Sequence, residues 1–316
     1  MGFAGAMVVA MAIDIVVGWP AKVFARIGHP VTWLGALINC ADQRWNHVDD
    51  TPAMRRAKGV AACLLTVATA VVPALMIQSA LPSGWFGVVL LGIVAWPLIA
   101  ARSLYDHVTA VAAPLERDDL VAARHAVSMI VGRDTSQLDE AGVARAAIES
   151  LAENASDGIV APVFWGLLLG LPGIAAYKAI NTLDSMIGHR TPRHEAFGWA
   201  SARIDDLANL VPARLTGLLF AAVSGALPSS LKCMLRDARH HRSPNAGWPE
   251  AAMAGALGVR LSGPRVYSDR IADEPWLNAR GGSGSVADLR RALRIYLLGM
   301  GALIGCLALG ATLTAR

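Results

Sequence analysis

Long apolar runs alternate with polar segments along the chain, and this pattern predicts membrane helices. The runs lie near residues 3–19, 59–80, 84–101, 159–177, 210–227 and 292–313. A helix that crosses a bilayer needs about 20 largely apolar residues, with about 17 as a practical minimum. The runs at 59–80, 84–101 and 292–313 contain charged residues only at their margins. Together the runs predict about four to six membrane segments.

The other runs carry features that an ordinary spanning helix lacks. The run at 3–19 contains Asp14, and because it lacks a basic n-region and a clear cleavage site we predict a retained segment rather than a signal peptide. The run at 159–177 is interrupted by prolines and glycines, which predicts either a span or a re-entrant, broken helix buried in protein. The run at 210–227 carries Arg214 near its start, where a long cation can reach the interface.

The polar parts of the chain form three segments in which we expect the chemistry: residues 102–158, 178–209 and 229–285. Within the first segment, apolar side chains recur at helical spacing through 106–131 and 138–153. This segment is therefore predicted to be helical.

Two local motifs mark the ends of predicted elements. Residues 134–136, with the sequence Asp-Thr-Ser, predict the N-terminal cap of the helix at 138–153. The glycines and serines of residues 281–285 predict a flexible linker before the last span. No strand-like alternation and no internal repeat is present. The predicted fold class is all-α: a polytopic helical membrane protein with helical cytoplasmic loops, in one domain over residues 1–316.

The composition supports a membrane protein. Hydrophobic residues make up 54% of the chain and charged residues only 16%, whereas soluble domains carry about 25% charged residues. The four cysteines are scattered without metal-binding spacing, so neither a disulfide framework nor a zinc site is expected. The chain is basic, with a formal net charge of +4. In a membrane protein such an excess usually belongs to cytoplasmic loops, so we expect no nucleic-acid partner.

The distribution of lysine and arginine predicts the orientation in the membrane. Residues 20–58 hold six of these cations and residues 229–291 hold ten, so both segments should be cytoplasmic. If the runs 159–177 and 210–227 both crossed fully, the polar loop 181–209 would lie on the far side. Because that loop carries candidate functional residues, we expect one of these crossings to be incomplete. The predicted location is the cell (inner) membrane, with several passes and an active site that faces the cytoplasm.

Residues 148–158 carry the densest set of acids and amides. Glu149 and Glu153 are four residues apart, so they share one helical face, where two like charges repel unless a counter-ion is present. Asn154 and Asp157 add oxygen atoms at the end of the helix. Hard oxygen ligands suit Mg²⁺, which often bridges protein carboxylates to nucleotide phosphates. The alternative is a solvated acidic face that ends in an Asx turn.

A second polar stretch directly follows the apolar run at 159–177. Lys178, Asn181 and Asp184 share one helical stripe there. Charged and amide side chains at a membrane edge are costly unless they are paired, which favours a functional role. The alternative is an interfacial helix whose polar side meets lipid headgroups.

A third polar stretch covers residues 197–214. Arg203 and Asp206 recur at helical spacing, and Asp205 stands four residues before Asn209. Adjacent acids beside an amide, at the point where the chain enters the membrane, again suggest that a metal or another cation binds. The alternative is an intrahelical pair between Arg203 and Asp206, worth less than about 1 kcal/mol.

The stretch 239–250 combines cations, the amide of Asn245 and a carboxylate with two prolines. Such a loop could hold a phosphate through arginine side chains and backbone N–H groups. The adjacent His240 and His241 raise the question of a metal site, but an exposed basic loop is the favoured interpretation for them.

Familiar catalytic motifs are absent from the chain. The sequence contains no P-loop, no dinucleotide-binding fingerprint, no GxSxG and no HExxH. Glycines 299, 301 and 305 lie inside an apolar run, where they favour helix packing. Taken alone, the residues therefore predict a membrane protein with a phosphate site and a metal site.

At these residues the chain resembles the CobD/CbiB family of cobalamin biosynthesis, the adenosylcobinamide-phosphate synthases. The similarity runs in one order across about residues 10–270, and its matching pieces are His29-Pro30-Val31, Leu34-Gly35, Gly132-Arg133-Asp134-Thr135, Ala147 to Asn154, Ser156-Asp157-Gly158, Asn181 to Met186, Phe197 to Ala200, Asp205-Asp206, Pro212-Ala213-Arg214 and Ser243 to Glu250. One departure is visible. Where the family commonly has Gly-Asp-Pro, this chain has Gly18-Trp19-Pro20, so any role of that acid does not transfer.

The resemblance implies a reaction. It implies that a carboxylate of adenosylcobyric acid is joined to the amine of (R)-1-amino-2-propanol phosphate, or a related amino alcohol, to give adenosylcobinamide phosphate. ATP and Mg²⁺ are the implied co-substrate and cofactor. A carboxylate must be activated before an amine attacks it, most simply as an acyl phosphate, and cations must then neutralise the phosphates.

Roles for individual residues follow as hypotheses laid on the matching positions. Mg²⁺ is expected to be held by Glu149, Glu153 and Asp157. A second acidic group, or a general base, is expected at Asp184, Asp205 and Asp206. Phosphate of ATP or of the substrate is expected to meet Arg133, Lys178, Arg203 and Arg214. Polar groups are expected to be oriented by Asn154, Asn181, Asn245 and, with less support, His29.

Two other function classes remain open on the sequence. A transporter for a corrinoid or another organic anion would use Asp14 and Arg214 as charges inside the membrane, and a membrane transferase could act on a lipid-linked phosphate. Only a ligase should need stoichiometric ATP and a free amine. The expected partners are the corrinoid, the amino alcohol phosphate, ATP and the lipid bilayer, and the glycine-rich spans leave open a homo-oligomer or an assembly with other cobalamin-pathway membrane proteins.

Overall fold

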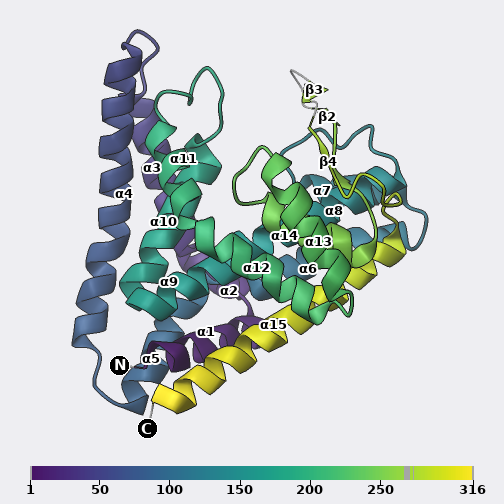
Figure 1. Cartoon of the computed structure of the whole chain (residues 1–316). Helices are drawn as coiled ribbons and strands as arrows, with labels where there is room; N and C mark the ends of the chain where they lie inside the picture. Colours follow the sequence, from purple (N-terminus) through teal and green to yellow (C-terminus); the bar gives the residue numbers. More distant parts are fainter. Residues whose placement is uncertain (1, 267–270, 273, 315–316) are drawn as a thin grey trace. The chain divides into compact units, whose positions relative to one another are not determined.

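The computed structural model describes residues 2–266, 271–272 and 274–314 (Figure 1). Most of the described chain is helical and very little of it is strand, which confirms the predicted all-α class. Its few strands are two residues long and form two antiparallel pairs. The chain divides into two compact units, each assembled from stretches that are far apart in the sequence.

Unit 1 comprises Met1–Ala100, Ala161–Asn209 and Leu307–Arg316. Its elements are α1 (Phe3–Val17), α2 (Ala21–Ile27), α3 (Pro30–Trp45), α4 (Pro52–Ala80), α5 (Trp85–Ala95), the 3₁₀ helix η1 (Trp96–Leu98), α9 (Ala161–Leu169), α10 (Leu171–Ile187), α11 (Trp199–Ala208) and the end of α15 (Val286–Thr314).

Unit 2 comprises Ala101–Val160 and Leu210–Cys306. Its elements are α6 (Ala101–Leu115), α7 (Leu120–Ser128), α8 (Glu140–Ala155), the π-helical turn η2 (Ser156–Val160), α12 (Leu210–Val223), α13 (Leu227–Asp237), η3 (Ala238–His240), α14 (Gly247–Leu257), β1 (Leu261–Ser262), β2 (Arg265–Val266), β3 (Ile271–Ala272), β4 (Trp276–Leu277) and most of α15 (Val286–Thr314).

Three helical stretches in the described chain are long and apolar enough to cross a membrane: Pro52–Ala80, Trp85–Leu115 and Val286–Leu313. They coincide with the predicted runs that carry no internal charge. The number rises to five if each of two bent helix pairs is one span, namely Phe3–Val17 with Ala21–Trp45 and Trp199–Ala208 with Leu210–Val223. The chain is therefore a polytopic membrane protein with three to five candidate spans, where the sequence predicts four to six.

The apolar run at 159–177 is broken, as one of the two sequence interpretations predicts. Helix α9 has nine residues, about 14 Å in length, which is too short to cross a hydrocarbon core of about 30 Å. Gly170 adopts a left-handed φ of 70° and ends it. Helix α10 then returns along α9, with Gly166 beside Ile174 and Gly173 beside Trp165. The two helices form an antiparallel hairpin, the shape that a re-entrant segment requires, and its re-entrance into the membrane stays a prediction.

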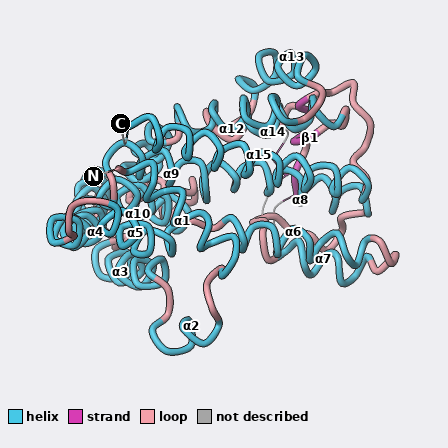
Figure 2. The backbone as a smooth tube through the Cα atoms, turned by 90° about the horizontal axis from the view of Figure 1, so that it is seen from below, coloured by secondary structure: helices cyan, strands magenta, loops and turns pink. Residues whose placement is uncertain are grey.

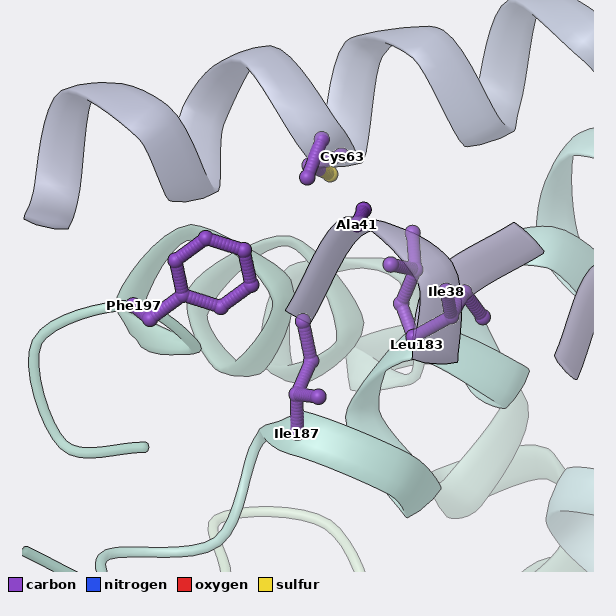
Figure 3. Packing of buried hydrophobic residues seen from close by; sticks show 7 residues of the cluster. Ile38, Ala41, Cys63, Leu183, Ile187 and Phe197 are labelled. Carbon is purple, nitrogen blue, oxygen red and sulfur yellow. The ribbon is translucent and has the colours of Figure 1, made fainter. Parts of the chain in front are cut away.

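Helix α10 runs antiparallel to the long helix α4 (Figure 1). At the hairpin tip, the side-chain oxygen of Gln78 accepts a hydrogen bond of 2.8 Å from the backbone N–H of Leu171. At the other end of α10, Leu183 and Ile187 pack in one buried cluster with Cys63 of α4 (Figure 3). The other members of that cluster are Ile38, Ala41, Ala62 and Phe197.

The loop between α10 and α11 is held at the N-terminal end of α4. The Arg193 guanidinium contacts the buried Asp42 carboxylate at 2.7 Å, and its backbone oxygen accepts hydrogen bonds from Asn46 and Arg55. Gly59 lies so close to the Phe197 carbonyl that no side chain fits there. The loop therefore emerges at the same end of unit 1 as the basic segment before α4. This position agrees with the expectation that the run at 159–177 does not cross the membrane completely.

We predict that cysteines placed at Val48 and His189 react from the same side of the membrane. The background would be a variant in which the four native cysteines are replaced by alanine, and the measurement is labelling of right-side-out and inverted vesicles with an impermeant thiol reagent. Both positions are exposed, and the hairpin returns the chain to its side of entry. Ser83→Cys, in the turn after α4, should react from the opposite side. Reaction of Ser83→Cys and His189→Cys from one side would contradict the re-entrant hairpin.

Helix α14 forms the centre of unit 2 and packs against α12, α13 and α8 (Figure 2). All of its residues are buried, including Trp248 and Glu250. Small side chains such as Gly255, whose Cα lies against the backbone of α13, let the neighbouring helices approach closely. This core supports the loops that carry the site in unit 2.

Three local predictions in unit 2 need correction. The predicted helix at 106–131 is two helices, because Asp118 takes a left-handed φ of 56° and Asp119 caps a new helix. The predicted cap at 134–136 is displaced, since the Asp139 carboxylate accepts the capping hydrogen bond of α8 from Gly142. The predicted flexible linker at 281–285 is held by backbone hydrogen bonds to Gly258 and Arg260 and ends in a serine that caps α15.

Candidate functional site

The first polar cluster lies in unit 2 around the buried carboxylate of Glu149 on α8. The Arg133 guanidinium lies 2.8 Å from Glu149 Oε2, and Arg145, one helical turn before Glu149, lies 3.8 Å from Oε1. The backbone N–H of Ser262 donates to Oε1 at 2.7 Å. Because Arg133 and Glu149 have side chains only 6% and 7% exposed, this ion pair is shielded from water. We call Arg133, Arg145 and Glu149 the arginine cluster.

The strand β1 delivers the Ser262 N–H to Glu149 through an unusual backbone. Ser262 has a φ of 61° and Gly263 a φ of 78°, both in the left-handed region. A Cβ at Gly263 would collide with the ring of Trp276 on the paired strand β4. The glycine therefore permits the turn and also leaves room for the indole.

Trp276 in turn holds two guanidinium groups. Arg145 lies 4.9 Å and Arg260 4.8 Å from the centroid of its ring, within the range of cation–π attraction. The two arginines also line a pocket of about 110 Å³, together with Asp139, Ala141, Gly142, Ser283 and Gly284.

The charge of the arginine cluster favours an anion. Two guanidinium groups meet one carboxylate, so the cluster has an excess positive charge in a partly buried place. The buried Nη1 atom of Arg133 has no hydrogen-bond partner among the described residues, and an unsatisfied buried donor is costly. A phosphate or carboxylate oxygen would satisfy it.

The predicted magnesium ligands do not form a preassembled set. Both oxygens of Glu149 already contact donors, Glu153 and Asn154 are exposed, and Asp157 is half-buried in the π-helical turn. The amide of Asn154 donates to the Ser150 carbonyl at 2.9 Å. Across the described residues, no group of three or more His, Cys, Asp or Glu side chains is arranged to hold a metal ion. The assignment of Mg²⁺ to Glu149, Glu153 and Asp157 stays a prediction.

The second polar cluster lies in unit 1, where α10 and α11 pack together. The Tyr177 hydroxyl donates to Asn209 Oδ1 at 2.9 Å, and the Asn209 amide donates to Asp205 Oδ2 at 3.0 Å. Asn181 and Asp184 of α10 are close enough to Asp205 to affect its ionisation. These five residues form what we call the carboxylate–amide cluster. The hypothesis drawn from the matching positions groups Asp184 with Asp205, whereas Tyr177 is not among the predicted site residues.

Asp205 is nearly fully buried beside a second carboxylate. Burial disfavours its charged form and the Asp184 carboxylate repels a second negative charge, which together raise the pKa of Asp205 to about 7. Asp205 stands beside the charged residues Arg203 and Asp206 in α11, the polar half of the bent pair that α11 forms with the apolar helix α12. A carboxyl group that titrates near neutral pH can accept or release a proton during a reaction.

The other predicted residues of unit 1 lie around this cluster. Lys178 is half-buried, and its charge acts on the ring of His29, which caps α3 by accepting from the Val31 N–H at 3.2 Å. Arg203 is exposed and lies 3.9 Å from Asp206, the intrahelical pair that the sequence offers as the alternative. Arg203 is therefore peripheral in this unit, whereas Asp206 is close enough to act on Asp205.

The stretch at 239–250 is more buried than an exposed basic loop. Asn245 is buried, and His241 lies 3.6 Å from the buried Glu250, so the exposed interpretation is wrong for His241 although it holds for His240. The guanidinium of Arg214 stacks 4.3 Å from the centroid of the Trp248 ring. This stretch holds α14 in place, and Arg214 is part of that packing.

Sequence reasoning missed Arg145, a member of the arginine cluster, and three residues around it: Arg260, Ser262 and Trp276. Only Arg145 had a local signal, because it stands four residues before Glu149 and provides the counter-ion that the two glutamates of α8 require. Arg260 and Trp276 reach the cluster through the pairing of β1 with β4 and through backbone hydrogen bonds between residues 258–260 and Gly282, and no spacing rule joins them to α8.

The family model described as CobD/Cbib protein matches residues 7–296 of the chain. A cobalamin biosynthesis protein CobD from Rhodobacter capsulatus is 62% identical over 311 residues, which are 98% of each chain. Proteins of the same name from Brucella suis and Rhizobium meliloti are 48% and 46% identical, over 94% and 92% of this chain and 93% and 91% of theirs. No solved structure matches the chain significantly.

Proposed function

Because the chain belongs to the CobD/CbiB family of cobalamin biosynthesis proteins, we propose that it is an amide-bond-forming ligase. It joins a carboxylate of adenosylcobyric acid to the amine of (R)-1-amino-2-propanol phosphate, or of a related amino alcohol phosphate, and the product is adenosylcobinamide phosphate. ATP drives the step. The substrates are cytosolic, so we place the active site on the cytoplasmic side of the cell membrane.

The proposed chemistry has two steps. A carboxylate oxygen of the corrinoid attacks the γ-phosphorus of ATP, the bond from that phosphorus to the β–γ bridging oxygen breaks, and an acyl phosphate and ADP form. The amine, after losing a proton, then attacks the acyl carbon, and the carbon–oxygen bond to phosphate breaks. A carboxylate, an ammonium group and ATP become an amide, ADP, inorganic phosphate and one proton.

The observation that carries the proposal is the position of the arginine cluster. Arg133, Arg145 and Glu149 lie on α8 and the loop before it, outside the long apolar helices of the described chain. A transporter for an anion would place its cations along the spans. Guanidinium groups held in a shielded polar region are instead suited to stabilise phosphate oxygens as charge moves between them.

The carboxylate–amide cluster provides the second role. Asp205, with a pKa near neutrality, is suited to accept the proton that the ammonium group must lose. The Asn209 amide holds one of its oxygens in place at 3.0 Å, and Tyr177 holds that amide. Asp205 is the proposed general base, and Asn209 and Tyr177 are positioning residues.

The oxygen donors at the end of α8 fit a magnesium ion that is completed by phosphate. Glu153 is exposed near the end of α8, and Asp157 is half-buried in the π-helical turn that follows it. Mg²⁺ commonly takes one or two protein carboxylates together with phosphate oxygens and water. When bound, the ion would neutralise phosphate charge. Glu149 would contribute through the arginines that it holds.

The reaction can be tested with purified protein in detergent, using adenosylcobyric acid, amino-propanol phosphate, ATP and Mg²⁺. We expect the corrinoid to gain the mass of one condensed amino-propanol phosphate, with one ADP formed for each amide. The product should be absent without ATP and should fall at least about 100-fold in Glu153→Gln. Tight corrinoid binding without a mass change, even with pathway membrane proteins added, would favour a transporter or a scaffold.

A further inference from the structure

The pocket at the N-terminal end of α8 is not explained by the roles assigned above. Its volume is about 110 Å³, and Arg145 and Arg260 line it together with Asp139, Ser283 and Gly284. We call it the Arg145–Arg260 pocket. It lies wholly in unit 2 and is formed by described residues.

Both guanidinium groups of the pocket are held in place before any ligand binds. Each lies less than 5 Å from the centroid of the Trp276 ring. Arg260 also donates to the Ser283 hydroxyl at 3.3 Å, and Arg145 is 3.8 Å from Glu149. Because stacking limits the motion of both side chains, little conformational entropy is lost when an anion binds between them.

The electrostatics of the pocket match a small dianion that carries an ammonium group. Two guanidinium groups and the positive end of the α8 dipole attract phosphate oxygens. Asp139 is the one carboxylate among the residues that line the pocket, and its Oδ1 accepts the capping hydrogen bond from Gly142 at 2.7 Å. That carboxylate is exposed and can pair with a cation of the same ligand.

We propose that the Arg145–Arg260 pocket binds the phosphate group of a small amino-bearing phosphate monoester. The identity of that monoester rests on the proposed function, in which it is the amino alcohol phosphate. Arg145 and Arg260 bind the phosphate and Asp139 favours the ammonium group. A pocket of about 110 Å³ matches a single phosphate group better than the whole of a nucleoside triphosphate.

The test is isothermal titration calorimetry of the full-length protein in detergent, with amino-propanol phosphate, the free amino alcohol, inorganic phosphate and ATP as separate ligands. We expect Arg260→Gln to weaken amino-propanol phosphate at least about tenfold and ATP less than about twofold. Arg117→Gln, which removes the same charge from an exposed site outside the pocket, should bind all four ligands like the wild type. Asp139→Asn keeps a good helix cap and should weaken only the amine-bearing ligands.

Several outcomes decide the proposal. Unchanged amino-propanol phosphate binding in Arg260→Gln would overturn it, and so would a loss confined to ATP. Arg260→Lys, which keeps the charge but not the planar fork, should recover part of the affinity, and thermal unfolding of each variant excludes a general loss of fold. If wild-type protein forms no amide but Arg260→Gln still loses the phosphate ligand, the pocket is supported while the proposed reaction fails.

Discussion

Replacing Asp205 with asparagine is expected to lower the rate of amide formation by about 100-fold to 10,000-fold, the usual contribution of a general base. The substitution keeps the shape of the side chain and its hydrogen bond to Asn209, but it removes the group that accepts the proton. The measurement is kcat at saturating substrates. Because the wild-type base works only when it is ionised, and its pKa lies near 7, the wild-type rate should fall as the pH decreases through that value.

The neighbouring carboxylate, Asp184, provides a control for the general-base role of Asp205. A purely structural role of Asp205 would not predict the result of this control. Asp184→Asn removes the negative charge that opposes the ionisation of Asp205, so the pKa of Asp205 should fall and the acid limb of the pH–rate profile should move to lower pH. A profile that does not move in Asp184→Asn, or an Asp205→Asn enzyme with wild-type kcat, would contradict the assignment.

Replacing Glu149 with alanine is expected to cost about 3–5 kcal/mol of the free energy of unfolding, because it leaves buried cations without a counter-ion. Arg133 and Arg145 would face each other without the carboxylate between them, and the Ser262 N–H would lose its acceptor. The measurement is the unfolding midpoint in detergent, followed by fluorescence with increasing denaturant.

An exposed ion pair of the same unit gives the matched control. Glu116 pairs with Arg290 at 2.5 Å, but both side chains are about 40% exposed, so Glu116→Ala should cost less than about 1 kcal/mol. The double variant Glu149→Leu with Arg133→Met should recover part of the lost stability, since the more deeply buried of the two uncompensated cations is then replaced by an apolar side chain. A Glu149→Ala protein that unfolds at the wild-type denaturant concentration would contradict the central position of this carboxylate.

The sequence predicts those parts of the fold in which one physical rule acts locally. Apolar length is such a rule, and it places α4, the helix at Trp85–Ala95 and the last helix within a few residues. Helical spacing is another, and it brings Asn181 and Asp184 onto one face and Asp205 beside Asn209. The carboxylate–amide cluster is therefore within reach of the sequence, although its closure through Tyr177 depends on how α10 packs against α11.

The partners of Glu149 could not be predicted in the same way. In the sequence, Glu149 stands four residues before Glu153, and this spacing alone suggests a metal ligand. In the fold, however, the carboxylate oxygens of Glu149 accept hydrogen bonds from Arg133 and from the Ser262 N–H. Ser262 is more than a hundred residues away along the chain and reaches Glu149 only through a turn with left-handed backbone. Tertiary structure of this kind carries no local signal.

The re-entrant hairpin also has a consequence for the way the protein enters the membrane. The connection from α10 to α11 carries His189, Arg190, Arg193 and Glu195, and moving such charges across a hydrocarbon layer is costly. Because the hairpin folds back on itself, we expect the insertion machinery to move only the apolar turn around Gly170 inward. The charged connection would then stay in the compartment in which it is synthesised. The side-chain oxygen of Gln78 then accepts a hydrogen bond from the backbone N–H of Leu171 at this turn, so that α4, which is made earlier, offers a surface onto which the hairpin assembles.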